Sequence, residues 1–438
     1  KVRYVRNITD VGHLEGDVDH GGEDKISKKA RLEQLEPMEV VQQYMNGFHD
    51  VMELFKTLPP SIEPRATGHI IEQIEMVQQI IDNGYAYEVN GSVYFDTPKF
   101  IKAKNVYGQL SGRVVDDLLS ETRDDLKKQD EKQHPSDFAL WIKADPKHLM
   151  RWPSPWSVGF PGWHLECSVM STKYLGETFD IHGGGNDLKF PHHENEVAQS
   201  YGACGHGPAN YWLHANMLLM NGKKMSKSDG NTISPGELFT GDSPHVSKAY
   251  HPTVVRFFML QTHYRSTLDL SDEALSASEK GYRRLIEANK LLQEMKTANN
   301  TENAPLDGQV EKLISDVYTE MSDDFNTPKA LAKLFEGVTL INQLNDGNKN
   351  IADLSAGMLS KLQELYAAFI FDVFGLTDTT QEGGDNSRFD ALMDLIVEIR
   401  TDARTNKNWT VSDLIRDKLQ EAGVVIKDSK EGTSWTLK

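Results

Sequence analysis

The sequence has 438 residues, of which 38% are hydrophobic and 26% charged, a composition ordinary for a globular chain of about two to four domains. A formal net charge of -18 argues against indiscriminate binding of nucleic acid, which needs clustered Lys and Arg, so any nucleic-acid partner must be bound selectively. No apolar run approaches the roughly 20 residues of a membrane helix. We therefore expect a protein that does not span a membrane. The two cysteines cannot form a disulfide framework, which favours a reducing compartment and so the cytoplasm.

The first part of the chain combines a strand pattern with two helical patterns. Residues 1–9 alternate as a strand, and the acidic, Gly-rich stretch at about 11–24 is expected to be an inserted surface loop. Apolar side chains then recur at helical spacing, which predicts amphipathic helices over residues 38–54 and 70–81.

A hairpin pattern begins the next module. The pair Asn90-Gly91 separates two short apolar runs, so we expect a β-hairpin with a primed turn over residues 85–95. The module is expected to extend to about residue 149, and its charged segment 120–133 predicts a solvated helix face. The Pro-, Gly- and Trp-rich segment 151–163 should follow as an irregular, rigid approach rather than a helix.

Three candidate metal ligands follow this segment. They are Cys167, His192 and Glu196, and the last two are four residues apart, a spacing that places both on one face of a helix. Thiolate, imidazole and carboxylate are ligand types that zinc accepts, and together they would supply three corners of a tetrahedron. The same spacing also fits a solvated His-Glu pair beside a buried, unreactive cysteine.

Glycines and lysines mark two candidate phosphate-binding segments. A short strand at 180–182 is expected to lead into Gly183-Gly184-Gly185, where backbone amides can approach a ligand closely, and Asp187 beyond it is placed to accept from a ribose hydroxyl. A plain strand-to-helix turn explains the triplet equally well. Residues 211–220 predict another strand, and the lysines of NGKKMSKSDGN at 221–231 suit a mobile loop that clamps phosphates, although a basic surface turn has the same composition.

The chain after residue 234 is helical in pattern, which predicts a helix bundle. Thr327-Pro328 indicates a helix start, with a capping hydroxyl followed by proline in the first turn. Polar, Gly/Asn-rich stretches at 297–308 and 377–387 are expected to be linkers. The predicted helices cover residues 254–262, 272–296, 310–321, 327–345 and 359–374.

A small terminal module is expected over residues 388–438. Its basic residues lie close in sequence to Trp409, and this combination suits stacking on, and pairing with, an RNA loop. A solvated helix with a half-buried tryptophan has the same pattern. The basic residues are Arg400, Arg404, Lys407, Arg416 and Lys418.

Three motifs occur in order along the chain, namely GWHLECS, HGGGNDLKFPHHENE and KMSKS. Together they resemble the motifs of class I aminoacyl-tRNA synthetases, and specifically those of the cysteinyl-tRNA synthetase family. The resemblance extends over nearly the whole chain, because it includes YVRNITD, EPRAT at 63–67, HYRS at 263–266, DDFNTP at 323–328 and the terminal GVVIKDSKEGTSW.

The resemblance implies an α/β fold, in which a Rossmann-like catalytic domain with an inserted connective module precedes an all-α bundle and a small anticodon-binding module. The implied parts are the first half of the catalytic domain (1–88), the connective insertion (89–149), the second half of the catalytic domain (150–220), the KMSKS loop with stem-contact helices (221–298), a DALR-like bundle (299–380) and the anticodon-binding module (388–438).

The resemblance also implies an activity, which is ATP-dependent activation of L-cysteine to cysteinyl-adenylate and transfer to tRNA-Cys. It implies a monomer that uses Mg²⁺ with ATP and one Zn²⁺ per subunit, the zinc held by Cys167, His192 and Glu196. The other roles that it implies are a substrate pocket of Thr9, Trp163 and His182, an ATP site of Gly183, Gly184, Gly185, Asp187 and Lys227, catalytic lysines Lys224 and Lys227, and anticodon contacts from Arg404, Trp409, Asp413 and Asp428.

The start of the sequence departs from the family. The strand and helix that carry the fourth zinc ligand, a cysteine, and the HIGH motif for ATP are not found, so we expect an N-terminal truncation. Two other functions therefore stay open, namely a non-catalytic fragment that binds tRNA or zinc and a ligase that joins cysteine to an amino sugar. The anticodon-type motif argues against the second, because such a ligase has no anticodon to recognise.

Overall fold

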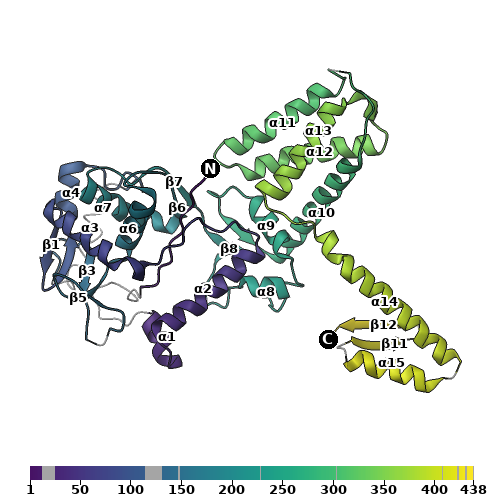
Figure 1. The fold of residues 1–438 in the computed structure, drawn as a ribbon, viewed down its shortest axis with the longest axis horizontal. Coiled ribbons are helices and arrows are strands. Elements are labelled where there is room, and N and C mark those ends of the chain that lie inside the picture. The colour runs from purple at the N-terminus through teal and green to yellow at the C-terminus, as the bar shows by residue number, and fades with distance from the viewer. Residues whose placement is uncertain are drawn as a thin grey trace. The chain divides into compact units, whose positions relative to one another are not determined.

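The structure is a computed structural model that describes residues 1–11, 25–113, 131–146, 148–226, 228–301, 303–406, 408–421, 424–429 and 432–437. It divides into two compact units, Lys1–Gly375 and Leu376–Lys438 (Figure 1). Most of the predicted loop at 11–24 and of the charged segment 120–133 lies outside the described residues. Within them, no helix has the length and apolar character needed to cross a membrane.

The N-terminal stretch is extended, but it does not form the continuous strand predicted over residues 1–9. It pairs in parallel with residues 61–66 through isolated bridges, Val5 to Ile62 and Ile8 to Arg65. Pro64 lies between the bridged positions and has no N–H to donate to the neighbouring chain, so the ladder is interrupted there. The prediction was wrong because regular pairing depends on the partner segment, which the periodicity of residues 1–9 does not show.

Three helices follow this stretch along the chain. Two of them confirm the predicted amphipathic helices, and the second of these buries Met76, Val77 and Ile80. The helices are α1 (Lys25–Glu33), α2 (Pro37–Leu54) and α3 (Ile70–Asp82), the last preceded by the 3-10 turn η2 (Ala66–His69).

A five-stranded sheet in the order β1-β2-β3-β5-β4 follows α3. The hairpin prediction is confirmed, since Asn90 and Gly91 both have positive φ, 54° and 90°, as a type I′ turn requires. The segment 151–163 is not a helix before Trp163, as predicted, but it is more regular than expected because it forms two of the strands. The strands are β1 (Ala86–Val89), β2 (Ser92–Phe95), β3 (Phe138–Lys143), β4 (Trp152–Pro153) and β5 (Val158–Pro161), with α4 (Thr97–Lys104) packed nearby.

A parallel pair of strands, β6 (Phe179–Gly185) and β7 (Ala209–Ala215), lies beside the helices α6 (Trp163–Leu175) and α7 (Glu194–Cys204) (Figure 1). The glycine triplet is paired within β6, whereas the sequence suggested that it follows the strand. The predicted strand 211–220 is interrupted at Asn216, whose N–H donates to the backbone of the HYRS segment, so β8 (Leu218–Met220) is a separate strand.

The chain between β8 and the bundle forms a small three-stranded sheet with two helices. Strand β8 pairs with β9 and, in parallel, with β10, and the predicted helix at 254–262 is confirmed by α9. The elements are β9 (Lys223–Lys224), α8 (Pro235–Thr240), α9 (Pro252–Leu260) and β10 (Leu268–Leu270).

The helix bundle confirms the four remaining predicted helices and the connection at 297–308. Its helices are α10 (Asp272–Glu294), α11 (Asp307–Ser322), α12 (Thr327–Asn345) and α13 (Ala356–Ala367), with the 3-10 turn η6 (Ile351–Asp353) before α13 and the π-helix η7 (Ala368–Val373) continuing it. The cap of α12 is Asn326, which accepts from the N–H of Lys329, and not Thr327, whose hydroxyl donates to the carbonyl of Leu260 in α9.

One buried carboxylate accepts hydrogen bonds near the first residues of two helices of the bundle, α11 and α13. Asp307, at the start of α11, accepts from the N–H of Ala304 at 3.1 Å and from the N–H of Ser355, the cap of α13, at 2.9 Å. Burial raises the pKa of Asp307, but these hydrogen bonds outweigh burial and hold the pKa below its ordinary value.

The second unit consists of two helices and a hairpin, α14 (Thr379–Thr405), α15 (Trp409–Glu421), β11 (Val424–Ser429) and β12 (Gly432–Leu437). The predicted linker at 377–387 is wrong, because α14 begins at Thr379. Glycine weakens a helix by only about 1 kcal/mol per residue, and the stretch contains no proline, which would have prevented one. Arg400 is also not a surface residue as its grouping with Trp409 assumed, since it is 4% exposed.

Candidate active site

Helix α6 positions the candidate thiol ligand. Its cap, Gly162, lies so close to β3 that an added Cβ would be 2.2 Å from the carbonyl oxygen of Ala139, so the start of the helix is fixed against the sheet. Cys167 is in the second turn of α6. Burial, and then the carboxylates of Glu196 and Glu166, raise the pKa of the Cys167 thiol well above its ordinary value.

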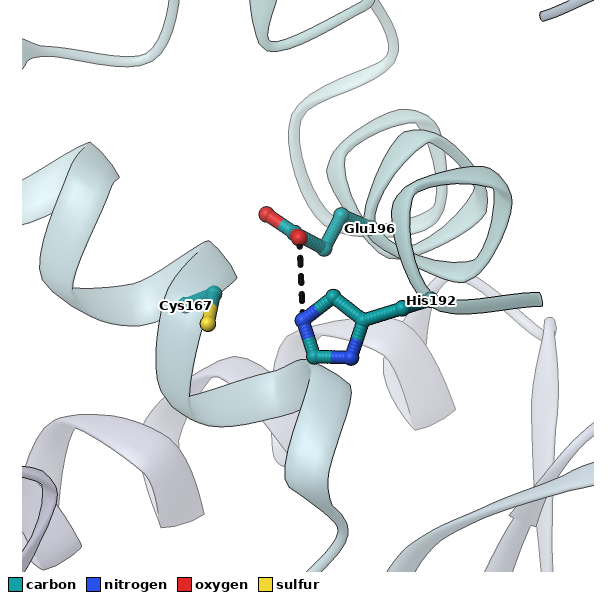
Figure 2. A group of neighbouring side chains, drawn as sticks. All are labelled: Cys167, His192 and Glu196. Atoms are coloured by element: carbon teal, nitrogen blue, oxygen red, sulfur yellow. Dashed lines mark ion pairs between the residues drawn. The ribbon is translucent and has the colours of Figure 1, made fainter. Parts of the chain in front are cut away.

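A kinked helical segment positions the imidazole and the carboxylate. The turn η5 (Lys189–His193) contains Phe190 in an extended conformation, with φ -141° and ψ 133°, and continues directly into α7. His192 is on one side of this junction and Glu196 on the other. Both side chains are therefore directed toward Cys167 on α6, as Figure 2 shows.

The three predicted ligands form one cluster. The Cys167 sulfur, an imidazole nitrogen of His192 and a carboxylate oxygen of Glu196 all lie within 4.8 Å of one another. His192 Nε2 is 3.2 Å from Glu196 Oε1, the ion pair drawn in Figure 2, and His192 Nδ1 is 2.9 Å from Nδ1 of His164. The contact with His164 leaves Nε2 of His192 directed at the other two ligands.

Glu196 is the most buried member of the cluster, at 1% exposed. Burial raises its pKa, but the imidazoles of His182 and His192 outweigh burial and hold the pKa well below its usual range, so the carboxylate is ionised. Its Oε1 makes the ion pair with His192 but no hydrogen bond of good geometry. A buried carboxylate oxygen without a hydrogen bond is costly, and a bound cation would satisfy it.

A second group of candidate ligands shares this carboxylate, since His182, His193 and Glu196 also lie within 4.8 Å of one another. His182 Nε2 is 2.8 Å from Glu196 Oε2; burial lowers the pKa of His182, but Glu196 outweighs burial and raises it. Burial lowers the pKa of His193 to about 3, so this ring is neutral, and its Nδ1 is 2.8 Å from Nε2 of His214.

Two further predicted residues, Thr9 and Trp163, lie at the edge of the cluster. The Trp163 ring is 4.4 Å from the His192 ring, measured between centroids. The amide of Asn7 donates to Thr9 Oγ1 at 3.3 Å and to the Cys167 sulfur at 3.6 Å. The structure therefore brings the predicted pocket residues together with the predicted metal ligands.

Comparison with known proteins identifies the family. Residues 1–280 match the family model described as the tRNA synthetases class I (C) catalytic domain, residues 316–378 match the DALR domain, and residues 388–435 match the cysteinyl-tRNA ligase anticodon binding domain. The cysteine–tRNA ligase of Bacteroides thetaiotaomicron is 54% identical over 438 residues, which are 100% of this chain and 87% of that protein. The chain belongs to the cysteine–tRNA ligase family.

A relative of lower identity also matches nearly the whole chain. The cysteine–tRNA ligase of Deinococcus radiodurans is 47% identical over 441 residues, which cover 99% of this chain and 84% of that protein. Among solved structures, Mycobacterium tuberculosis methionyl-tRNA synthetase in complex with methionyl-adenylate has a TM-score of 0.55 at 14% identity, covering 84% of this chain and 91% of that chain. The predicted fold class is thereby confirmed.

These comparisons also decide between the functions that the sequence left open. A ligase that joins cysteine to an amino sugar has no need of the anticodon binding domain that residues 388–435 match. Full-length relatives are cysteine–tRNA ligases, so the chain is an aminoacyl-tRNA synthetase, an enzyme that joins an amino acid to tRNA, and neither alternative is supported.

The glycines assigned to ATP lie next to the ligand cluster of this cysteine–tRNA ligase. Gly184 faces His193, and an added Cβ would lie only 2.6 Å from Cε1 of that ring. Asp187 is exposed in the 3-10 turn η4 (Asn186–Leu188), directly after the glycines. Gly183 and Gly185 pair with Leu213 and Ala215 of β7, so their backbone is held by the sheet.

The KMSKS segment is only partly described. Lys224 is exposed in β9, and Lys227 lies outside the described residues. Gly222 and Gly230 on either side have positive φ, 74° and 62°, and these backbone conformations suit glycine.

The residues assigned to the anticodon lie in the second unit. Arg404 is exposed in the last turn of α14, and Trp409, 57% exposed, is the first residue of α15. Asp413 in α15 pairs with Arg416 at 3.4 Å, and Asp428 is a residue of β11 whose side chain is not described.

Sequence reasoning missed the residues that support the cluster, namely Asn7, His164, His193 and His214. The motif HHENE contains His193, but spacing alone does not show which of two adjacent histidines faces the thiol. Asn7 and His214 contact the cluster only through the fold, so no local signal identifies them.

Proposed function

We propose that the cluster of Cys167, His192 and Glu196 holds a zinc ion with which this cysteine–tRNA ligase selects cysteine. The observation that carries the proposal is the convergence of a thiol, an imidazole and a carboxylate within 4.8 Å, with a buried carboxylate oxygen that lacks a hydrogen bond. The donor set fits zinc, which binds sulfur, nitrogen and oxygen ligands of these kinds. When bound, zinc would supply a direct bond to the thiolate of cysteine, whereas the hydroxyl of serine is a poor zinc ligand.

The side chains around the cluster would orient the substrate. Trp163 and Thr9 border it, and the amide of Asn7 holds both Thr9 and the Cys167 sulfur. His182, whose pKa is raised by Glu196, donates to that carboxylate and keeps it from rotating. A pocket that judges shape alone separates near-isosteres by only about 10²-fold, so fixed ligands add discrimination that shape cannot.

Adenylate formation would take place at the adjoining end of β6. There the backbone of Gly183, Gly184 and Gly185 lets a nucleotide approach, and Asp187 accepts from its ribose. The cysteine carboxylate would attack the α-phosphate of Mg-ATP and displace diphosphate, while Lys224 and Lys227 would stabilise the charge that develops on the phosphate oxygens. These roles rest on the family motifs and on the exposure of Asp187 and Lys224.

The second unit would recognise the anticodon of tRNA-Cys. The exposed Trp409 ring is available to stack on a base, with Arg404, Asp413 and Asp428 contacting base edges or backbone. We assign the enzyme to the cytoplasm because its two cysteines are free thiols, and we propose that it acts as a monomer.

The zinc assignment is tested with His192→Ala in the full-length enzyme. Metal content measured by atomic emission should fall to a small fraction of one equivalent, and the preference for cysteine over serine in adenylate formation should fall to about 10²-fold or less. The matched control is His206→Ala, because His206 pairs with Glu177 at 3.1 Å outside the cluster. Retained zinc with unchanged cysteine preference in His192→Ala would contradict the proposal.

A further inference from the structure

The DDFNTP segment contains an unusual turn. Asp324 and Phe325 are consecutive and both have positive φ, 57° and 53°. Non-glycine residues rarely adopt this conformation, and for a bulky side chain such as phenylalanine it is a genuine outlier. Backbone strain of this kind persists only where surrounding contacts enforce it, and it concentrates at functional sites.

Several contacts hold the turn in place. The Asp324 carboxylate accepts from the hydroxyl of Tyr264 at 2.7 Å and pairs with Arg265 at 2.8 Å. Burial, and then the hydrogen bond to Asp324, raise the pKa of Tyr264 to about 12, so its hydroxyl remains a donor. The carbonyl of Phe325 accepts from the N–H of Thr327 at 2.7 Å.

Packing of Phe325 inside the protein contributes little stabilisation, because the residue is 50% exposed. Burial of the ring therefore does not account for the strain of its backbone. The turn instead presents an aromatic face to solvent in a fixed position. A fixed, exposed aromatic ring is a means of stacking on another flat group.

A polar cavity of about 400 Å³ adjoins the turn, lined by Lys189, Trp212, His214, Arg265 and Asp324 among others. Within the described part of the chain, the Lys189 ammonium makes no ion pair. Burial, and then Lys189, lower the pKa of His214, so this ring stays neutral. The cavity wall thus offers an ammonium that has no ion pair among the described residues, a guanidinium that pairs with Asp324, and an aromatic surface, and the two cations and the aromatic surface suit a phosphate-bearing ligand.

This cavity lies beside the ligand cluster, with His214 as the link between them. His214 on its wall is 2.8 Å from His193, which belongs to the second ligand group around Glu196. Lys189 begins the turn η5, which also carries His192. A ligand in the cavity would therefore lie next to the place where the amino acid is activated.

We propose that this cavity and the Phe325 ring bind the single-stranded 3′ end of the tRNA, placing one nucleotide base on Phe325 and the adjoining phosphate at Lys189 and Arg265. The proposal rests on the function as a tRNA ligase, whose second substrate must bring its 3′ end to the activated cysteine. Single-stranded RNA ends are recognised by stacking on aromatic side chains and by cations along the backbone, and both features occur here.

The test uses Phe325→Gly in the full-length enzyme. Glycine adopts positive φ without strain, so the turn should be kept and the melting temperature should stay equal or rise. Loss of one stacked base should slow transfer of cysteine from preformed adenylate to tRNA by about five- to 100-fold in single-turnover assays. Adenylate formation should change less than twofold. The matched control is Phe371→Ala, which removes another exposed ring, on η7, and should leave both steps unchanged.

A second measurement separates RNA contact from a structural role. Removal of the unpaired 3′ nucleotides of the tRNA should weaken binding to Phe325→Gly less than binding to the wild type, because the variant has already lost the stacking contact and only the contacts of Lys189 and Arg265 remain to be lost. Lys189→Ala should lower the slope of log affinity against log salt by about one. If the wild type charges tRNA with cysteine and Phe325→Gly does so at the same rate, this inference is overturned while the proposed function stands. An equal loss of adenylate formation and transfer would also overturn it.

Discussion

Gly184 offers the sharpest test of how closely the active site is packed. In the Gly184→Ala variant the new Cβ would lie 2.6 Å from Cε1 and 2.9 Å from Nε2 of His193, whereas ordinary contact begins at 3.4 Å. The ring must therefore move by about 0.8 Å. It has little room, because it is buried between the rings of His182 and Trp212, at 4.8 and 5.1 Å between centroids.

The cost follows from this geometry. Inserting a methyl group into a packed interior typically destabilises by about 1–3 kcal/mol, and the shift also strains the hydrogen bond between His193 and His214. Since His193 adjoins Glu196, the ligand cluster should be displaced as well. A misplacement of about 1 Å can cost on the order of 10²-fold in rate, so adenylate formation should fall by about 10- to 100-fold.

Urea unfolding at neutral pH and adenylate formation at saturating ATP measure these two effects. Gly183→Ala is the control for stability, because its added Cβ would meet only the Leu213 carbonyl oxygen at 3.7 Å, an ordinary contact. In a His193→Ala background the contacts with the ring disappear and only Leu188 Cδ1, at 3.2 Å, stays close; this atom is the end of a flexible side chain, so Gly184→Ala should then cost less than about 0.5 kcal/mol. An equal cost of Gly184→Ala in both backgrounds would refute the steric explanation.

Three further predictions concern the bundle and the second unit. Gly337→Ala should destabilise by about 1–3 kcal/mol in urea unfolding, because its Cβ would lie 2.2 Å from the Tyr366 hydroxyl; Gly357→Ala, with no atom within 4 Å, should stabilise slightly. Asp307→Asn should cost about 1 kcal/mol at pH 6; because the folded pKa of Asp307 is lowered, the difference should shrink as pH falls below the ordinary value of 3.8. Trp409→Ala should weaken tRNA charging about tenfold or more with cysteine activation intact, and an equal loss in both assays would mean that Trp409 is structural.

Elements with a strong local signal were predictable from the sequence. The Asn90-Gly91 pair has backbone freedom that suits a primed turn, and the apolar spacing of residues 70–81 matches a face that the helix buries. In both cases the information lies within a few neighbouring residues, and tertiary contacts reinforce it.

Elements that depend on distant partners were not predictable in the same way. Residues 1–9 are extended as their pattern suggests, but their hydrogen-bonded pairing with residues 61–66 is interrupted at Pro64, which has no N–H and lies far along the chain. Arg400 carries a charge that favours the surface, yet the packing of α14 buries it. The Gly-rich start of α14 illustrates that composition weakens a helix without preventing one.

The ligand types of the site were predictable because chemistry restricts them. One of the two cysteines, and a histidine four residues before a carboxylate, made Cys167, His192 and Glu196 candidate ligands, and the structure brings these three together. Their supporting contacts were not predictable. The orientation of the His192 ring depends on its contact with His164, and the Cys167 sulfur accepts from the amide of Asn7, which lies 160 residues earlier in the chain.

Glu196 connects the two ligand groups, and this sharing constrains how the site works. Its Oε1 faces His192 and its Oε2 faces His182, so the same carboxylate orients a candidate metal ligand and a residue of the substrate pocket. An ionised carboxylate that is 1% exposed is stable only while both imidazoles accompany it. A substitution on either side should therefore disturb the other, so the proposed selection of cysteine and the proposed retention of a metal would depend on one connected set of side chains rather than on two independent sites.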